Sequence, residues 1–493
     1  MIIPSKKLTK AFIKMKEKFS KIKNNGFVQA WKEILVSRCF PFITAAISLF
    51  CYYLGLDIVF IYYIGIVGIM ILLFLDDISP FVTLLLFMCI LISRENSPSN
   101  LSTSSNYYFS PAILTQIFIV IGALSTALIY RIILTCIRRQ FSISAIFWGL
   151  CAFAVVLLCN GLFSQNYTTK NLVYGLVMAL CFLGIFTALK DNLSMTDEAF
   201  ERIALSFFAL SIVLIFELLV AYFTVDGLYV DGNFNREKLT FGWGMWNTMG
   251  MMLLICLPSV LYLAGKYKYG FIFTLFSIVL FVTIWMSCSR QSMLASLVLY
   301  PVCLIVLLVK GNNRFANICL VVCSFVAILI LLLISRDTIL KYFKDLISKI
   351  VVNGELSGNG RMKLWEGGIK NFKSAPFLGI GFYANLYTEF LDGFLGFSGM
   401  SLIPNMCHNT FIQLLSACGI IGLLTYLIHR VQTIISFFKN INFNRTFIAL
   451  TIVALVGVSL IDNHIFNIFP TIIYSCLIAI LVASEKKDNQ SRK

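Results

Sequence analysis

Apolar stretches separated by short polar connectors make up most of this 493-residue chain. A helix that crosses a bilayer needs about 20 mainly apolar residues. About fourteen stretches qualify, the first three of them short: 40–55, 57–75, 79–93, 111–135, 142–163, 170–189, 202–225, 244–265, 270–288, 290–309, 315–335, 408–429, 446–461 and 465–483. The pattern predicts an all-α integral membrane protein with about 12–14 transmembrane helices.

Composition supports a membrane protein and argues against a nucleic-acid partner. Hydrophobic residues are 59% of the chain and charged residues 13%, with a mean hydropathy of +0.88. A soluble protein of this composition could not cover its surface with polar groups. The net charge of +16 is concentrated in the N-terminal segment and in short connectors, so we expect contact with lipid headgroups.

The basic residues also predict how the chain is divided and oriented. We expect a basic amphipathic cytoplasmic segment (1–39), an N-terminal transmembrane bundle (40–335), a long external loop (336–407), C-terminal transmembrane helices (408–484) and a cytoplasmic tail (485–493). A disordered basic tail is the alternative for the first segment. Lys and Arg are more frequent in alternate connectors, which places both termini in the cytoplasm. The connectors predicted to be cytoplasmic contain Arg138, Arg139, Lys190, Arg202, Lys266, Lys268, Lys310, Arg314, Arg430, Lys439 and Arg445.

Polar residues are informative in such a chain because lipid penalises them. Residues 286–292 form a polar island between two apolar stretches and include Ser289 and Arg290. The guanidinium of Arg290 either reaches lipid headgroups from the interface or binds a phosphate in a bidentate manner.

The long loop contains a second polar motif. Arg361, Trp365 and Ile369 recur every four residues, which predicts a short amphipathic helix that begins near Gly360. The glycine-rich segment 376–382 follows it. This helix either lies in solvent or belongs to a loop folded back over the membrane face.

His408 and Asn409 directly precede the apolar run 411–427. Asn409 is a suitable N-cap for that helix. The positive end of the helix dipole disfavours protonation of the His408 imidazole, and a neutral histidine can act as a general base. A purely structural histidine is the alternative.

Two further places carry candidate residues. Lys238 can assist phosphate binding, and Trp246 can stack on a sugar or belong to an interfacial aromatic belt. Asp462, with Asn463 and His464, forms a turn between the last two apolar runs that either lines the same site or only caps helices. No Cys/His cluster has metal-ligand spacing and no DxD-like pair lies on the external face, so we expect neither metal nor cofactor.

Three of these motifs together resemble the O-antigen ligase/polymerase family, whose members handle polyprenyl-pyrophosphate-linked glycans. They are Ser289-Arg290 at the end of one span, NGRMKLWEGGIKNFKSAPFLGIGF (359–382) in the loop and CHNTFIQLLSACGIIGLL (407–424) at the next helix. The resemblance implies a GT-C-type bundle with an external site, in which Arg290 and Arg361 hold the donor pyrophosphate and His408 acts on the acceptor hydroxyl. The N-terminal third gives only general similarity, which leaves acceptor recognition open.

The resulting hypothesis is a metal-independent, inverting membrane glycosyltransferase. It would polymerise oligosaccharide repeats from polyprenyl-pyrophosphate donors, together with other membrane proteins of glycan assembly. A ligase that transfers a finished glycan, and a flippase or transporter of the lipid-linked glycan, are the alternatives. The candidate substrate-binding residues are Ser289, Lys238, Trp365, Asn409, Trp246 and Asp462.

Overall fold

The structure, a computed structural model, describes residues 26–88, 111–138, 140–165, 167–224, 228–230, 233–234, 240–241, 244–311, 314–334, 351–352, 355–356, 361–383 and 407–491. Lys238 and residues 1–25 lie outside these ranges, and so does most of the loop 336–407. Every structural statement below refers to the described residues.

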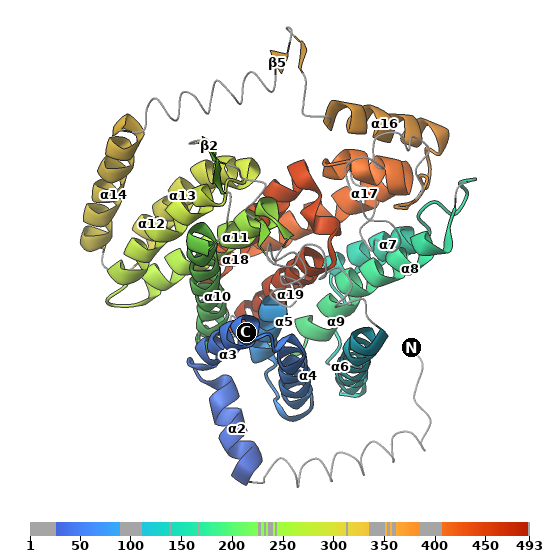
Figure 1. Ribbon diagram of the computed structural model, residues 1–493. Coiled ribbons are helices and arrows are strands. Elements are labelled where there is room, and N and C mark those ends of the chain that lie inside the picture. Colours follow the sequence, from blue (N-terminus) through green and yellow to red (C-terminus); the bar gives the residue numbers. More distant parts are fainter. Residues whose placement is uncertain are drawn as a thin grey trace.

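Almost all regular structure is helical (Figure 1). The N-terminal helices are α2 (Gly26–Val36), α3 (Phe40–Leu54), α4 (Asp57–Phe74), α5 (Ser79–Met88), α6 (Pro111–Ile137) and α7 (Ala145–Leu158). The middle of the chain forms α8 (Thr169–Ala179), a π-helical turn (Leu180–Gly184), α9 (Ile185–Lys190), α10 (Asp197–Thr224), α11 (Trp246–Lys266), α12 (Phe271–Met286), α13 (Arg290–Lys310) and α14 (Arg314–Ile334). The C-terminal part forms α16 (Arg361–Ser374), α17 (Thr410–Lys439), α18 (Phe443–Asp462), a 3₁₀ turn (His464–Phe466) and α19 (Ile468–Ser491).

Three antiparallel hairpins of two-residue strands complete the secondary structure. They are β1–β2 (Tyr229–Val230 with Asn233–Phe234), β3–β4 (Thr240–Phe241 with Gly244–Met245) and β5–β6 (Val351–Val352 with Glu355–Leu356).

The predicted all-α membrane class is confirmed, and in the described part of the chain each predicted apolar range overlaps a helix. Eight helices of the described part are long and apolar enough to cross a membrane, or nine if α2 and α3, bent by 92°, form one span. The apolar stretches of helices α4, α5, α7 and α12 are shorter, with only 10–17 residues each. Some of these end at sharp turns, as α7 does before Gly161 (φ 69°) and α12 before Cys288 (φ 56°). By helix length, the count of full crossings in the described part is therefore lower than the predicted 12–14.

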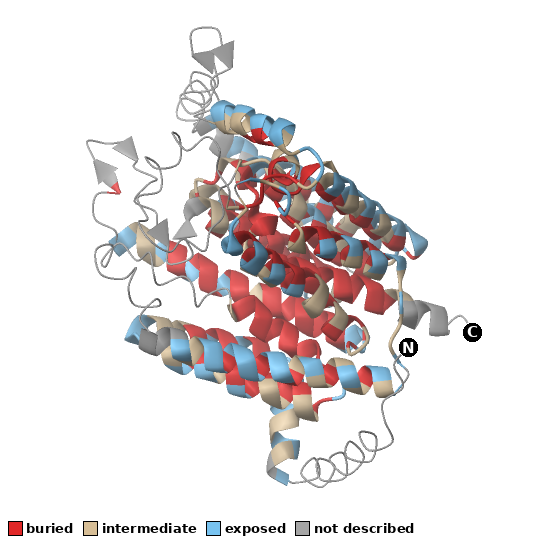
Figure 2. Cartoon of the chain, turned by 90° about the vertical axis from the view of Figure 1, so that its right-hand side faces the viewer, coloured by how far each residue is buried: buried red, intermediate tan, exposed pale blue. Residues whose placement is uncertain are grey.

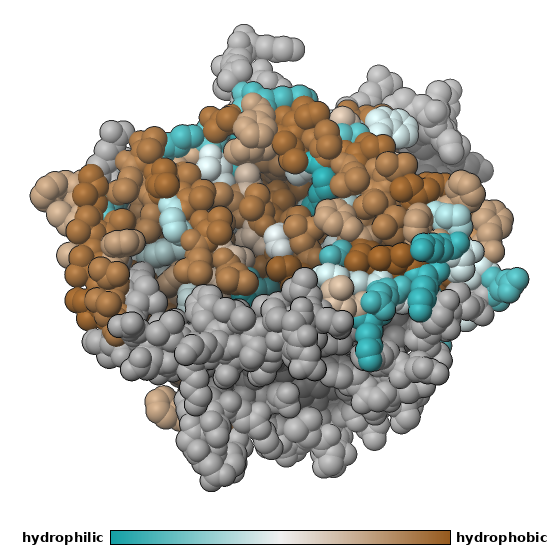
Figure 3. All heavy atoms as spheres, turned by 90° about the horizontal axis from the view of Figure 1, so that it is seen from above, coloured by the Kyte–Doolittle hydropathy of each residue, from teal (hydrophilic) through white to brown (hydrophobic). Residues whose placement is uncertain are grey.

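Helix α11 lies at the centre of the bundle. It packs against α10, α12, α13 and α18, and 94% of its most apolar 18-residue stretch is buried. Buried residues fill the middle of the molecule, while the outer helix faces are exposed (Figure 2). Those outer faces are apolar, with Val298, Phe325 and Leu333 each more than 60% exposed. Viewed from the end that carries α16, apolar residues cover much of the described surface (Figure 3). An exposed apolar surface of this extent is suited to lipid.

Hydroxyl groups link neighbouring helices inside the apolar bundle. Thr83 of α5 bonds Ser206 of α10 (2.8 Å), and Ser277 of α12 bonds Tyr300 of α13 (3.2 Å). Such bonds stabilise helix pairs where the surroundings offer no water.

Helix α17 is interrupted at Gly419, and the segment 376–382 fills the gap. Gly419 has φ 66° and ψ −165°, a conformation open essentially only to glycine. Four backbone hydrogen bonds join the two segments: Ile380 N to Ser416 O (2.9 Å), Gly381 N to Ala417 O (3.0 Å), Ile420 N to Pro376 O (2.8 Å) and Ile421 N to Phe377 O (3.3 Å). The broken helix therefore keeps its backbone groups paired, as a membrane interior requires. This pairing fixes the glycine-rich segment, and α16 before it, on the first turns of α17.

We expect Gly419→Ala to destabilise the protein by about 2 kcal/mol or more, because both the backbone conformation and the space exclude a side chain. A Cβ at this position would lie 2.3 Å from the carbonyl carbon of Phe377. Thermal unfolding of the purified chain in detergent measures the effect. Gly457→Ala in α18 is the matched control, since nothing lies within 4 Å of its added Cβ. Equal melting temperatures for the two variants would contradict the expectation.

Candidate functional site

The carboxylate of Asp462, the last residue of α18, is the centre of a polar network. Its Oδ1 accepts a hydrogen bond from Nδ1 of His408 and lies 3.7 Å from Nη2 of Arg361. Its Oδ2 accepts hydrogen bonds from Nδ2 of Asn247 (2.7 Å) and Nε2 of Gln291 (2.9 Å). Only 5% of the Asp462 side chain is exposed. Groups from α11, α13, α16 and the start of α17 thus meet at one buried carboxylate.

The end of α18 is shaped by its capping residue. Asn463 adopts the left-handed conformation (φ 57°), and its N–H donates to the carbonyl of Ser459 (2.9 Å). Asparagine is one of the few residues besides glycine that tolerate this cap. The helix therefore stops at Asp462 and leaves the carboxylate at the end of the bundle that carries α16.

His408 lies immediately before the start of α17. Asn409 caps the helix as predicted, since its Oδ1 accepts from the N–H groups of Phe411 (3.0 Å) and Ile412 (3.1 Å). His408 itself has a positive φ of 49°, and 34% of its side chain is exposed. If Nδ1–H donates to Asp462, the lone pair of a neutral imidazole is on Nε2. This arrangement provides a base with a carboxylate partner and an accessible second nitrogen.

Arg361 is the first residue of α16, so the helix begins one residue after the predicted position. Its side chain is 33% exposed and faces Asp462. Gly368 of the same helix packs directly on the segment of His408, because a Cβ there would lie 3.0 Å from Cys407 Sγ. Further along, Asn371 donates to the hydroxyl of Ser416 (3.1 Å). The predicted loop helix therefore packs against α17 and brings its guanidinium to the site.

Arg290 is the first residue of α13 and directly precedes Gln291. Ser289 is the N-cap position, but its hydroxyl bonds Ser292 (3.0 Å) and makes no cap bond to the backbone. The serines of this polar island surround Gly250 of α11, where a Cβ would lie 2.5 Å from Cβ of Ser289. They serve tight helix packing, and that packing sets the position of the half-buried Arg290.

The remaining predicted residues are less well placed. Trp365 is half-buried, and within the described ranges its Nε1 has no hydrogen-bond partner. Trp246 begins α11, but its side chain lies outside the described part, as Lys238 does entirely. The structure thus brings together His408, Arg361 and Asp462, and places Arg290 next to a residue of their network.

Roles for Gln291 and Asn247 were missed by sequence reasoning. A polar amide in the first turn of an apolar helix is costly unless it is paired, and this signal was present at both positions. His464 belongs to the turn that was expected either to line the site or only to cap helices, and it is in the network: its Nε2 lies 2.9 Å from Nε2 of Gln291. Burial lowers the pKa of His464, so this imidazole is neutral at neutral pH.

Other reactive groups near the site do not compete with His408. Burial raises the pKa of the Cys407 thiol to about 12, so this neighbour is not a thiolate at neutral pH. Within the described ranges, no group of three or more His, Cys, Asp or Glu side chains is arranged to hold a metal ion.

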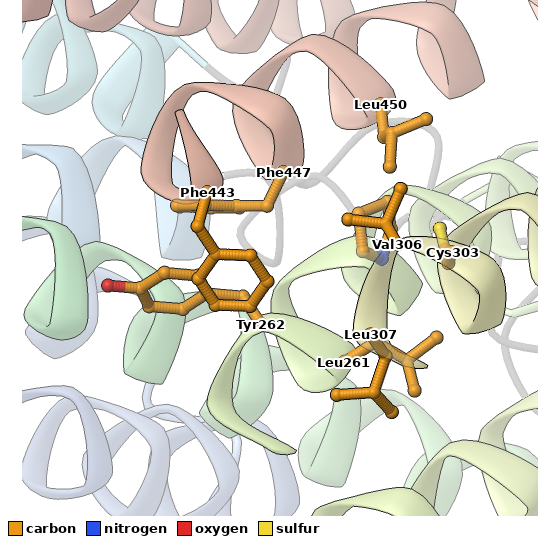
Figure 4. Close-up of a pocket in the computed structure, with 9 residues that line it drawn as sticks. Leu261, Tyr262, Cys303, Val306, Leu307, Phe443, Phe447 and Leu450 are labelled. Atoms are coloured by element: carbon orange, nitrogen blue, oxygen red, sulfur yellow. The ribbon is translucent and has the colours of Figure 1, made fainter. Parts of the chain in front are cut away.

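An apolar pocket between α11, α13 and α18 is separate from this network (Figure 4). Tyr262 and Phe443 stack along it with ring centroids 5.2 Å apart. Phe443 is at the opposite end of α18 from Asp462, about 28 Å away along the helix axis. The pocket therefore does not contribute to the polar site.

The fold and the network define a multi-pass membrane protein with a His/Arg/Asp site at one end of its helix bundle. Residues 275–427 match the family model described as O-antigen ligase, and this range includes Arg290, Arg361 and His408. No curated protein matches the chain. Over residues 275–427, the match supports the resemblance to the O-antigen ligase/polymerase family that the motifs predicted. Asp462, Asn247 and His464 lie outside the matched residues.

Proposed function

We propose that this chain is a glycosyltransferase that joins oligosaccharide repeat units carried on polyprenyl pyrophosphate. The observation that carries the proposal is the convergence of His408, Arg361 and the residue after Arg290 on the carboxylate of Asp462. A base beside two guanidinium groups is suited to a reaction in which a hydroxyl attacks and a pyrophosphate leaves. The match of residues 275–427 to the O-antigen ligase model supports the choice of a lipid-linked glycan as the donor.

The site would face the exterior, with both termini in the cytoplasm. The basic side chains predicted to be cytoplasmic support this orientation. At the end of the bundle that carries α2, Arg38 pairs with Glu201 (2.6 Å) and Arg202 with Asp77 (3.1 Å). An excess of Lys and Arg marks the cytoplasmic side of a membrane protein.

The transfer step would proceed by a single displacement. The Nε2 atom of His408 takes the proton of the acceptor hydroxyl as its oxygen attacks the anomeric carbon. The bond from that carbon to the pyrophosphate oxygen breaks, which inverts the configuration. Arg290 and Arg361 stabilise the negative charge that develops on the leaving pyrophosphate, so the step needs no divalent cation.

Asp462 would support His408 and not bind substrate directly. Both of its oxygens already accept hydrogen bonds from protein groups, which leaves it the tasks of orienting the imidazole and stabilising the imidazolium. The alternative within the same site is that His408 only positions the acceptor hydroxyl by hydrogen bonding and does not take its proton.

A ligase that transfers a finished glycan to a lipid or another acceptor is the second candidate, because the matched family model is described as O-antigen ligase. It would use the same site with a different acceptor groove. A flippase or transporter of the lipid-linked glycan is the third candidate, and it was proposed from the sequence alone.

Mass spectrometry of the lipid-linked glycans in a deletion strain separates these functions. We expect single repeat units to accumulate on the external face, because the polymerase step is missing. Accumulated long chains would indicate the ligase, and single units confined to the cytoplasmic face would indicate the flippase. Complementation with a chain changed to alanine at Arg290, Arg361 and His408 should fail, and normal polymer length with that variant would refute the site.

A further inference from the structure

The second oxygen of Asp462, Oδ2, accepts hydrogen bonds from amide groups and not from the proposed base. Oδ1 faces His408 and Arg361, while Oδ2 faces the amides of Asn247 and Gln291. Nε2 of Gln291 lies 2.9 Å from Asp462 Oδ2 and also 2.9 Å from His464 Nε2. A glutamine NH₂ group has two hydrogens. One donates to the carboxylate and the other to the imidazole.

This geometry determines the orientation of the Gln291 amide and the protonation state of His464. The reverse orientation of the Gln291 amide would place its oxygen against the carboxylate of Asp462, so the nitrogen must face it. Nε2 of His464 must then accept, which places the ring proton on Nδ1 and makes the imidazole neutral. The His464 side chain is 4% exposed, and within the described ranges its Nδ1 has no hydrogen-bond partner. Its hydrogen bond to the network holds the amide of Gln291, and its Nε2 also lies 3.7 Å from Asp462 Oδ2.

We propose that Gln291 and His464 are a pair of positioning residues that hold the Asp462 carboxylate in the orientation His408 requires. The inference rests on the proposed function, in which His408 is the base. Gln291 directly follows Arg290 at the start of α13, so one helix end positions both a cation for the donor and the carboxylate behind the base. His464 acts through Gln291, and neither residue needs to touch a substrate.

The pair also affects how tightly His408 binds its proton. The titratable and charged groups that face Asp462 are His408, Arg361 and His464, from the start of α17, from α16 and from the turn after α18. The hydrogen bond from Gln291 disperses part of the negative charge of Asp462. Without it, the carboxylate would attract the imidazolium form of His408 more strongly. Removal of Gln291 should therefore move the titration of His408 to higher pH.

Labelling with diethyl pyrocarbonate tests this directly in the full-length chain, because the reagent attacks neutral imidazole. The chain has three histidines, of which His429 and His464 are buried and His408 is 34% exposed. Mass spectrometry measures how much of His408 is labelled at each pH. We expect the pH of half-maximal labelling, the labelling midpoint, to rise in Gln291→Leu. His464→Leu should show a smaller rise, and His464→Gln, which can offer an amide oxygen to Gln291, should restore the wild-type midpoint. Ser296→Ala is the matched control, since this buried serine of α13 bonds only the carbonyl of Met293 (2.7 Å) and should change nothing.

Transfer assays with a polyprenyl-pyrophosphate-linked oligosaccharide give the second measurement. We expect Gln291→Leu to lower kcat about tenfold or more, equivalent to about 1.4 kcal/mol, with KM for the donor little changed. The double variant Gln291→Leu/His464→Leu should be no slower than Gln291→Leu, because both act through one carboxylate.

The two measurements separate this inference from the function on which it rests. An unchanged labelling midpoint in Gln291→Leu overturns the positioning role, whatever the transfer rate. A lower melting temperature with unchanged kcat and midpoint overturns it as well, because the pair is then only structural. If the wild-type chain transfers no glycan while the midpoint shifts as expected, the proposed function fails and the positioning of His408 stands.

Discussion

With His408 replaced by alanine, the chain is expected to insert normally and to transfer glycan about 10²–10⁴-fold more slowly. The imidazole of His408 combines a partly exposed ring with a carboxylate partner, whereas the other imidazole of the network, that of His464, is buried. Without it, the acceptor hydroxyl keeps its proton during attack. The two guanidinium groups would still bind the donor, so KM for the donor should change much less than kcat.

Asp462→Asn should reproduce a large part of this loss. An asparagine keeps the size of the side chain but removes the charge that stabilises the imidazolium of His408. Its amide would also face the donors Asn247 and Gln291, which now bond a carboxylate oxygen. Cys407→Ser is the control next to His408, because this half-buried thiol has no role in the proposed step. Full transfer activity in His408→Ala would show that the imidazole neither abstracts the proton nor positions the acceptor.

Local sequence patterns predicted the elements of this site well. The start of α16 at Arg361, the position of His408 before α17 and the cap at Asn409 all follow from side-chain spacing and helix-end chemistry. These signals are contained within a few residues, and the same is true of the apolar ranges. Helix lengths were less accurate: α17 extends to Lys439, ten residues beyond its predicted end.

Tertiary contacts explain what the sequence left open. Asp462 was predicted as one of several substrate-binding residues, yet it is the point where groups from 54 to 215 positions away meet. A periodic sequence pattern cannot predict contacts between residues so far apart in the chain. The break of α17 at Gly419 was equally hidden, because hydropathy treats 408–429 as one apolar run. Only the pairing with segment 376–382 makes the interruption stable.

Arg361→Lys is the second substitution for which we expect a large effect, a loss of about 10- to 100-fold in kcat/KM, because charged hydrogen bonds are worth about 1.5–3 kcal/mol each. Arg361 lies 3.7 Å from Asp462 Oδ1 at the open side of the network, with a third of its side chain exposed. A guanidinium can bind two phosphate oxygens in one plane, whereas an ammonium group is a point charge. Lysine therefore keeps the attraction for the donor but loses the paired contact that strengthens as the pyrophosphate leaves. Arg361→Ala should cost about 10²–10³-fold, as for other groups that stabilise a developing charge.

The reverse exchange on the same helix is the control that separates geometry from charge. Lys363 lies two residues further along α16 and is exposed, so Lys363→Arg should leave transfer unchanged. Arg361→Lys and Lys363→Arg each conserve net charge, and the double variant exchanges the two side chains. If the guanidinium is needed at position 361, the double variant will be as slow as Arg361→Lys alone. Wild-type kcat/KM in Arg361→Lys would mean that a positive charge is sufficient there, and the bidentate role would then have to be assigned to Arg290 alone.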